Sequence, residues 1–510
     1  MVQNSQFNKI IQDLRQNAFR VLLVLVSVVV ATAALSTISS SFLVLKREMD
    51  TNFLGTNPSD ATLFFVPDSS KNIVSALETY PSVSAAELRQ IIEGRVEVSP
   101  NNWQTLILFV VNDFKNLQIN TFDLEKGKLP TEQSEAVIER SCVSVAQRQI
   151  GETLAIQVEN GIKTSLNLCG IVHDPAEPPG WMHGEINTYI AASSLEKIGL
   201  PTVQNAVKIK HKNKNLDRYT AQKEVLGIKQ FLENQGFKIL RTNVPPPATH
   251  PHDRQLKAIL SILLVFSFII LILSSVIIAN MMNGFLTRQT KQIGIMKAIG
   301  ASTAQISRLY LGFIGSMIIF AVPLGWLLSF PIVKLFTQFV ANQLNFNILN
   351  PYSPQWVSVF QILICLLIPF IFGFLPVKKA MRKTVLSALN DTSLNTQMKT
   401  TLWVNLGKYI SRPLLLTIRN TFRQKRRFWL TMSSLALGGA AFMASFNVQS
   451  AWKSTIAAVE AKQRYDIDIK LFDAVPINRF DSLVKEIGII RQLARITFGK
   501  LKTFQKFDNQ

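Results

Sequence analysis

Five long apolar segments without a charged residue constrain this chain most. They occupy residues 21–45, 258–281, 309–333, 356–377 and 428–452. A membrane-spanning helix needs about 20 mostly apolar residues, and buried helices of soluble proteins rarely run that far without a charge. The first segment is also longer than the apolar run of about 7–15 residues in a cleaved signal peptide, so we expect it to be retained. The sequence therefore predicts an α-helical polytopic membrane protein with about five transmembrane helices.

The distribution of charge along the chain predicts its orientation. The chain has 54 Lys+Arg and 33 Asp+Glu residues, a net charge of +21. Residues 1–20, 282–308 and 378–427 together hold 19 basic and 2 acidic residues, whereas residues 46–256 hold 22 basic and 24 acidic ones. Because basic residues gather in cytoplasmic loops, the three short segments and the N-terminus are expected inside and residues 46–256 outside. This distribution of charge predicts that the chain's partner is a lipid bilayer. We predict no nucleic-acid partner, since no nucleic-acid-binding module is recognisable.

Residues 46–256 are long enough for a large extracytoplasmic α+β domain. Stretches rich in β-branched and aromatic residues predict strands at 61–66, 106–111, 135–138, 154–158, 166–172, 188–191 and 206–209. Helical patterns lie at 73–80, 85–92, 143–150 and 221–235. Pro245, Pro246 and Pro247 then return the chain to the membrane, and His250 and His252 are expected in a solvated linker.

No catalytic or metal-binding set can be assembled from the sequence. The three cysteines have no CxxC spacing, and the five histidines include no HExxH motif. Cys142 and Cys169 both fall in the predicted outside domain, where a disulfide between them is possible and two buried thiols are the alternative. We therefore predict no catalytic residue, no metal and no directly bound cofactor.

The loop between the second and third spans carries the most specific pattern. Gly300 suits the C-terminal end of a helix, and Ser302 suits the N-cap of the next one. Ile293, Met296 and Ile299 recur every three residues, which predicts one apolar stripe on a short amphipathic helix. Such a helix would dock on a cytoplasmic partner or rest on lipid headgroups, and the pattern leaves both open.

This loop resembles the FtsX-like permease family of ABC transporters, which includes the MacB and LolC/LolE permeases. The family pattern is roughly basic-x-x-E-I-G-[IV]-[LM]-[KR]-A-[LI]-G-A-[ST]. This chain has KQIGIMKAIGAS at residues 291–302. One departure is Gln292, where the family usually has Glu. The resemblance implies that an element contacting a partner ATPase contains Arg288, Lys291, Gln292, Ile293, Gly294, Met296, Lys297, Ala298, Gly300, Ala301 and Ser302.

The resemblance also covers the order of the segments over residues 10–450. It implies an amphipathic cytoplasmic N-terminus at 1–20, a MacB-like core domain at 46–256, a coupling loop at 282–308 and a basic linker at 378–427. Residues 413–448 echo the entry into the first span, so residues 453–510 are expected to begin a second, incomplete outside domain. We therefore expect a C-terminally truncated member with duplicated halves.

The function implied by this resemblance is that of a permease subunit in a bacterial plasma membrane. A partner ABC ATPase would supply the ATP hydrolysis, since the chain has no GxxxxGK[ST] motif. The movement would export or extract a lipid, lipoprotein or peptide, with a second permease copy or a periplasmic protein as further possible partners. The alternatives are a secondary transporter, for which Pro323 and Gly325 in the third span are the best support, and a membrane-anchored sensor.

Overall fold

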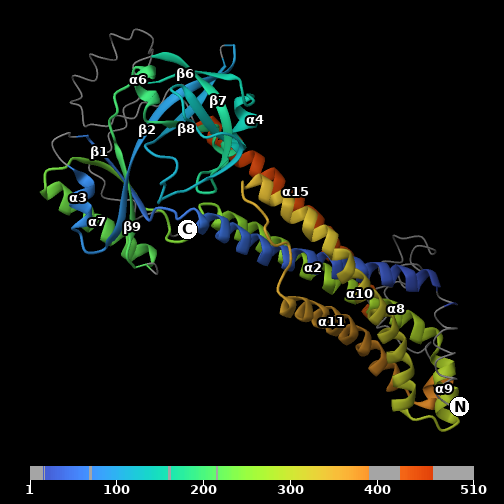
Figure 1. The fold of residues 1–510 in the computed structure, drawn as a ribbon. Helices are drawn as coiled ribbons and strands as arrows, with labels where there is room; N and C mark the ends of the chain where they lie inside the picture. Colours follow the sequence, from blue (N-terminus) through green and yellow to red (C-terminus); the bar gives the residue numbers. More distant parts are fainter. Residues whose placement is uncertain are drawn as a thin grey trace. The chain divides into compact units, whose positions relative to one another are not determined.

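The computed structural model describes residues 15, 18–67, 72–100, 102–158, 162–213, 216–389 and 425–462. These residues include four helices that are long and apolar enough to cross a membrane (Figure 1): α2 (Ala18–Gly55), α8 (Asp253–Arg288), α10 (Thr303–Gln343) and α11 (Gln355–Met381). Four of the five predicted spans are thereby confirmed as apolar helices, and each helix is longer than the span predicted within it.

The fifth predicted span, residues 428–452, lies within helix α15 (Lys425–Lys462). That this helix crosses a membrane stays a prediction. Most of the predicted N-terminal segment 1–20 lies outside the described residues, as do residues 390–424 of the basic linker and residues 463–510 of the second outside domain.

The helices α2, α8, α10 and α11 form a bundle around a shared apolar core, and a smaller apolar cluster lies near the sheet domain. Phe285 of α8 stacks on Phe313 of α10, with 5.2 Å between the ring centroids, and both are buried. The bundle also has a polar contact, because Gln361 of α11 donates hydrogen bonds to the hydroxyls of Ser39 and Ser40 on α2 (2.7 and 3.0 Å). Such bonds fix one helix against another where neither can use water.

Helix α10 is continuous from Thr303 to Gln343 although it contains Pro323 and Pro331. Gly325 lies where this helix meets α2, since a Cβ atom at this position would come within 2.6 Å of the Val29 carbonyl oxygen. Gly325 is therefore explained by the close approach of two helices, and neither it nor Pro323 marks a broken transport helix.

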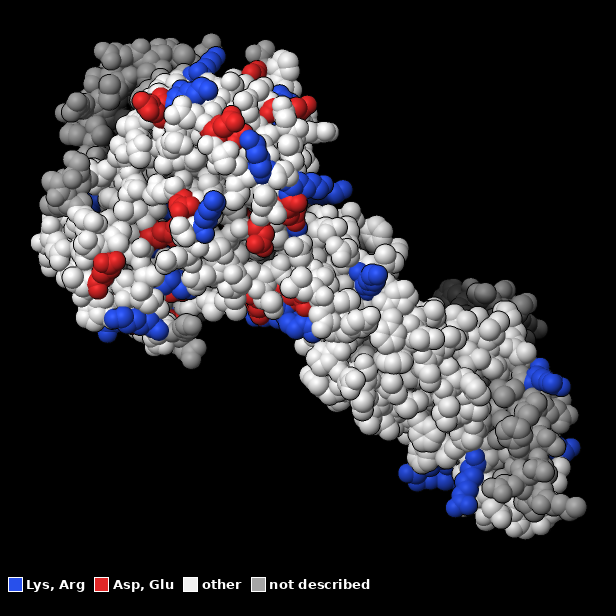
Figure 2. Space-filling view, in the orientation of Figure 1, with Lys and Arg blue, Asp and Glu red and all other residues white. Residues whose placement is uncertain are grey.

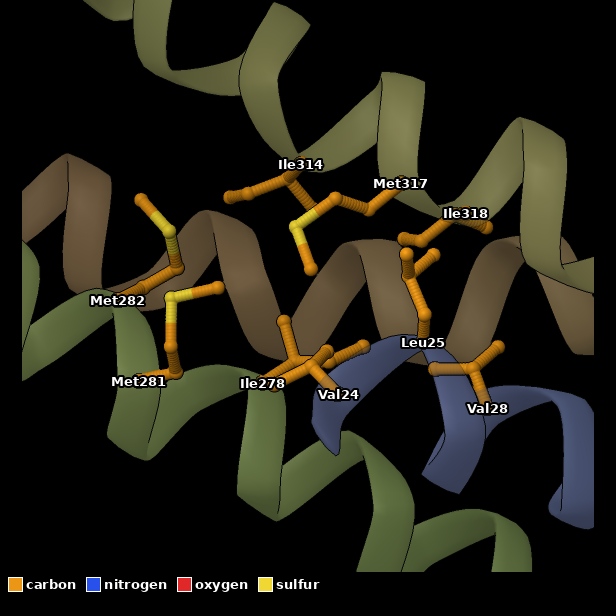
Figure 3. A pocket seen from close by; sticks show the side chains of 9 residues that line it. All are labelled: Val24, Leu25, Val28, Ile278, Met281, Met282, Ile314, Met317 and Ile318. Atoms are coloured by element: carbon orange, nitrogen blue, oxygen red, sulfur yellow. The ribbon is translucent and has the colours of Figure 1, made fainter. Parts of the chain in front are cut away.

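A narrow apolar hollow lies where α2, α8 and α10 meet (Figure 3). Its walls are aliphatic or methionine side chains: Val24, Leu25, Val28, Ile278, Met281, Met282, Ile314, Met317 and Ile318. No side chain in this lining carries a charge or a hydrogen-bonding oxygen or nitrogen. The hollow is therefore part of the packed bundle core and offers neither a charged group nor an oxygen or nitrogen ligand.

Between α2 and α8 the chain folds into the sheet domain, defined as residues 61–243. Its ten strands are β1 (Ala61–Phe65), β2 (Val83–Ser99), β3 (Asn102–Val111), β4 (Asp123–Gly127), β5 (Glu135–Glu139), β6 (Thr153–Gln157), β7 (Lys163–His173), β8 (Glu185–Ala191), β9 (Ala206–His211) and β10 (Ile239–Asn243). They follow the order β10-β1-β9-β2-β3-β8-β5-β7-β4, with β6 pairing to β2 and β7. The pairs β3–β8 and β5–β7 are parallel and the others antiparallel. The predicted α+β class is confirmed.

Short helices complete the domain. They are α3 (Ile73–Glu78), the 3-10 turn η1 (Arg140–Cys142), α4 (Val143–Ala146), α5 (Gly180–His183), α6 (Ser194–Ile198) and α7 (Arg218–Asn234). Helices α3 and α7 share an apolar core with β1 and β9, in which Leu77, Val207 and Ile228 are buried. A second core, around Leu106, Leu154 and Leu168, is formed by residues of β2, β3 and β5 to β8, and a smaller one contains Val137 and Tyr189.

The prediction of a helix at residues 85–92 was wrong, because these residues belong to the long strand β2. The first half of β2 pairs with β9, as in Glu87 opposite Lys208, and the second half pairs with β3, as in Ile92 opposite Leu108. Ala85, Ala86 and Leu88 favour helix locally, but pairing with strands on both sides outweighs a propensity of a few tenths of a kcal/mol per residue.

Cys142 and Cys169 are both free thiols, so the possible disulfide is not formed. Cys142 is buried and its sulfur accepts a hydrogen bond from the Asn187 amide (3.3 Å). Cys169 lies on β7, where its thiol donates to the carbonyl oxygens of Lys128 and Ala136 (3.3 Å each). The two thiols make hydrogen bonds with different groups and not with each other. Of the two predicted possibilities, the structure therefore has the one without a disulfide.

Candidate functional site: helix α9 and the loop after α10

Helix α9 (Thr290–Ala298) contains most of the predicted coupling residues and begins directly after α8 ends at Arg288. It ends as the sequence predicts. Gly300 has a φ of +97°, and the Ala301 amide donates back to the Met296 carbonyl (2.9 Å), which closes the helix end. Ser302 then caps α10 by accepting from the Gln305 amide, and the Gln305 side chain accepts from the Ser302 amide.

The predicted single apolar stripe on α9 is divided between two faces. Ile293 and Gly294 are buried against the bundle, and Met296 and Ala301 pack at the edge of the same core. Ile299, by contrast, is 79% exposed and Ile295 is 47% exposed. The side chain of Ile293 therefore anchors α9 on the bundle, and its assignment to the ATPase-coupling element stays a prediction.

The opposite face of α9 is open. We define the α9 face as the exposed residues Lys291, Ile295, Ala298 and Ile299. Arg288 and Gln292 are also exposed, whereas Lys297 is half-buried. On the face of the molecule shown in Figure 2, basic residues and no acidic ones lie at this end of the bundle. The sequence has no Asp or Glu from residue 254 to residue 390, so α9 and the helix ends next to it add basic side chains and no acidic ones to this surface.

At the other end of the bundle, charged residues hold the helices that enter and leave the sheet domain. Lys46 of α2 forms ion pairs with Asp253 of α8 (2.8 Å) and with Asp50 one turn further along α2 (2.5 Å). Lys257 completes the group through Asp253 (2.7 Å). This group ties α2 to α8 where the two helices leave the apolar part of the bundle.

The loop between α10 and α11, residues 344–354, is bonded to the sheet domain. Asn345 is buried, with a left-handed φ of 59°, and its side-chain amide donates to the Glu139 carboxylate (2.7 Å). Arg140 donates to the side-chain oxygens of Asn345 (2.7 Å) and Asn347 (2.8 Å). The Trp181 indole donates to the carbonyl of Gln343 at the end of α10 (3.1 Å).

The carboxylate in this contact is held in its charged form. Burial of Glu139 opposes ionisation, but hydrogen bonds from His173, and then from Ser141 and Asn345, outweigh it and keep the pKa of Glu139 below its usual value. A charged acceptor strengthens each of these hydrogen bonds.

The same loop is bonded to α2. Glu48 is buried and accepts from the Leu349 amide (2.8 Å), and the Asn52 side chain bonds Asn347 in both directions (2.9 and 3.0 Å). A movement of α10 would therefore be passed to the sheet domain and to α2 at once. Sequence reasoning missed this loop, and its one signal was the dense run of Asn at 342, 345, 347 and 350.

The bundle can be compared with known proteins. Residues 264–385 match a family described as FtsX-like permease C-terminal. The match begins inside α8, includes α9, α10 and α11, and ends at the first residue of α12 (Val385–Leu389). This chain carries an FtsX-like permease domain. The resemblance predicted from residues 291–302 is confirmed.

Two curated proteins are similar to part of this chain. The ABC transporter permease YtrF of Bacillus subtilis is 34% identical over 132 residues, which is 24% of this chain and 30% of YtrF. A probable export ATP-binding/permease protein of Pseudomonas fluorescens is 28% identical over 165 residues, 32% of this chain and 23% of that protein. The matches therefore span less than a third of either relative.

Two solved structures are similar to parts of this chain. The extracellular domain of a noncanonic ABC-type transporter, YknZ, from Gram-positive bacteria is covered completely by 35% of this chain, at 9% identity and a TM-score of 0.23. The periplasmic region of MacB from Actinobacillus actinomycetemcomitans is covered to 96% by 41% of this chain, at 16% identity and a TM-score of 0.24.

Proposed function

We propose that this chain is the membrane subunit of an ABC transporter and that its α9 face binds a cytoplasmic ATPase. The observation that carries the proposal is the exposure of Ile295 and Ile299 on a helix anchored by the buried Ile293. Two large apolar side chains on a basic helix suit a protein surface with an apolar pocket and acidic rim. ATP would act through that partner, with no cofactor bound by this chain.

The bonded loop after α10 supports the rest of the proposal. Force applied at α9 would move α10, and the contacts of Asn345 and Glu48 would carry that movement to the sheet domain and to α2. By resemblance to the FtsX-like permease family, the movement would extract or export a lipid, lipoprotein or peptide. A second permease copy or a periplasmic protein would complete the assembly.

The orientation belongs to the same proposal. The basic end that carries α9 would face the cytoplasm of a bacterium, together with the N-terminus, and the sheet domain would lie outside the plasma membrane. The secondary-transporter alternative receives no support from α10, because Pro323 and Gly325 lie in a continuous helix.

The test isolates the complex from native membranes through a tag on this chain and measures its ATP hydrolysis. Ile299→Asp should remove both the ATP hydrolysis and the subunit that carries the phosphate-binding loop. Ile150→Asp, at a 40% exposed isoleucine of the sheet domain, is the matched control and should leave both unchanged. Full recovery of an active complex with Ile299→Asp would overturn the proposal.

A further inference from the structure

Helix α12 (Val385–Leu389) lies against α9 at the basic end of the bundle. It has only five residues, too few to be stable alone. Thr384 caps its first turn by accepting from the Ser387 amide (3.3 Å), and Ala388 is buried. Leu386 is 71% exposed, so α12 offers a large apolar side chain to a partner.

Lys297 fixes the position of α12 relative to α9. Its ammonium group donates to the carbonyl oxygens of Met381, at the end of α11, and of Lys383, in the turn before α12 (2.7 Å each). A cation is favoured at a helix C-terminus, where carbonyl groups lack helical partners. The sequence assigned Lys297 to partner contact, but its charge is directed to the chain's own backbone.

The charge around the two helices indicates what covers them. Arg288, Lys291, Arg382 and Lys383 are exposed there, and the sequence from residue 254 to residue 390 has no acidic residue. A partner protein with acidic side chains around an apolar pocket matches this surface in both charge and polarity.

We propose that α12 is the second half of the ATPase-binding surface, with Leu386 beside Ile295 and Ile299, and that Lys297 is the positioning residue that holds the two helices in one surface. The proposal rests on the proposed function of α9. The partner would then contact α12, which follows α11, as well as α9, which precedes α10. Helix α11 would therefore be moved directly by the ATPase.

The experiment titrates the purified ATPase onto the full chain in nanodiscs and measures the Kd and the stimulated ATP hydrolysis. Leu386→Asp should weaken binding at least tenfold. Leu226→Asp, at an exposed leucine of α7 in the sheet domain, is the matched control and should not change the Kd. A charge placed in an apolar contact is costly, whereas one at a solvated site is not.

Lys297 is tested by two variants. Lys297→Met removes the donor and should weaken binding as Leu386→Asp does, whereas Lys297→Arg, which can donate to both carbonyls, should restore the Kd. A role in stability alone would lower the thermal midpoint of Lys297→Met but leave the Kd of its folded fraction unchanged, and that result would overturn the positioning role.

The outcomes separate this inference from the proposed function. If Ile299→Asp binds the ATPase as the wild type does, the proposed function fails. If Ile299→Asp loses binding while Leu386→Asp and Lys297→Met keep it, only the inference about α12 fails. A fluorophore on Leu386→Cys should be shielded by the ATPase, and shielding by anionic lipid alone would identify a headgroup contact and overturn the inference.

Discussion

Asn345, in the loop after α10, donates a hydrogen bond from its side-chain amide to the buried carboxylate of Glu139 at the end of β5 (2.7 Å). The two residues are separated by 206 positions in the sequence, and their contact joins the helical bundle to the sheet domain. The Nε atom of Arg140 donates a hydrogen bond to the side-chain oxygen of the same Asn345 amide (2.7 Å).

We expect Asn345→Asp to break this contact, because a second carboxylate would face Glu139. Asn345→Gly should cost less, about 1–3 kcal/mol, since glycine suits the φ of 59° and only the amide is lost. Hydrogen exchange of residues 344–354 measures both effects. Glu139→Gln combined with Asn345→Asp should partly restore protection, because the glutamine can donate to the new carboxylate. Equal protection in Asn345→Asp and the wild type would contradict the expectation.

The contact between α10 and α2 should be sensitive to one methyl group. Gly325→Ala places a Cβ atom within 2.6 Å of the Val29 carbonyl oxygen and 2.8 Å of the Thr32 Cβ, so the helices must separate. Overpacking of this kind costs about 1–3 kcal/mol, which should lower the thermal midpoint in detergent.

Gly315→Ala is the control for that substitution. It lies on the same helix, but a Cβ atom there meets no other group within 4 Å. The alanine should leave stability unchanged or raise it slightly through helix propensity. Similar midpoints for the two alanine variants would show that α10 and α2 do not approach as closely as described.

Much of the bundle and of α9 could be predicted from the sequence, because apolar length, capping residues and glycine act locally. The boundaries set by Gly300 and Ser302 are examples. The predictions that were wrong concern residues whose conformation or exposure depends on their tertiary neighbours. Residues 85–92 favour helix but pair as strand, and Ile293 and Ile299 share one sequence pattern while facing the bundle and solvent respectively. The Asn345–Glu139 contact has no local signal, since its partners are far apart in the chain.

The end of α9 should depend on the backbone freedom of Gly300. Gly300 has a φ of +97°, and a β-branched residue would be strained in this backbone conformation even though no other group lies within 4 Å of the added Cβ atom. Gly300→Val should unwind the last turn of α9 and raise hydrogen exchange at Ile299 and Ala301. Gly300→Asn should have a smaller effect because asparagine tolerates positive φ. Identical exchange in both variants would contradict this account.

His250 should make the stability of the protein depend on pH. The sequence predicts a solvated linker at this position, but the imidazole is buried, its ring lies edge-on to Phe53 of α2 (5.4 Å) and its Nδ1 accepts from the His252 amide (3.1 Å). Burial, and then the neighbouring His252 and Lys46 charges, lower the pKa of His250 to about 4, although Asp253 opposes the shift.

The direction of the effect follows from that pKa. The unfolded chain binds a proton near pH 6.5 and the folded chain only near pH 4, so the contribution is complete above pH 6.5 and is lost as the pH falls toward 4. Between pH 7 and pH 5 we expect a loss of about 2 kcal/mol. His250→Asn keeps an acceptor near the Nδ1 position without titrating, so its thermal midpoint should fall less over this range. Parallel pH profiles of the variant and the wild type would show that His250 is protonated equally in both states.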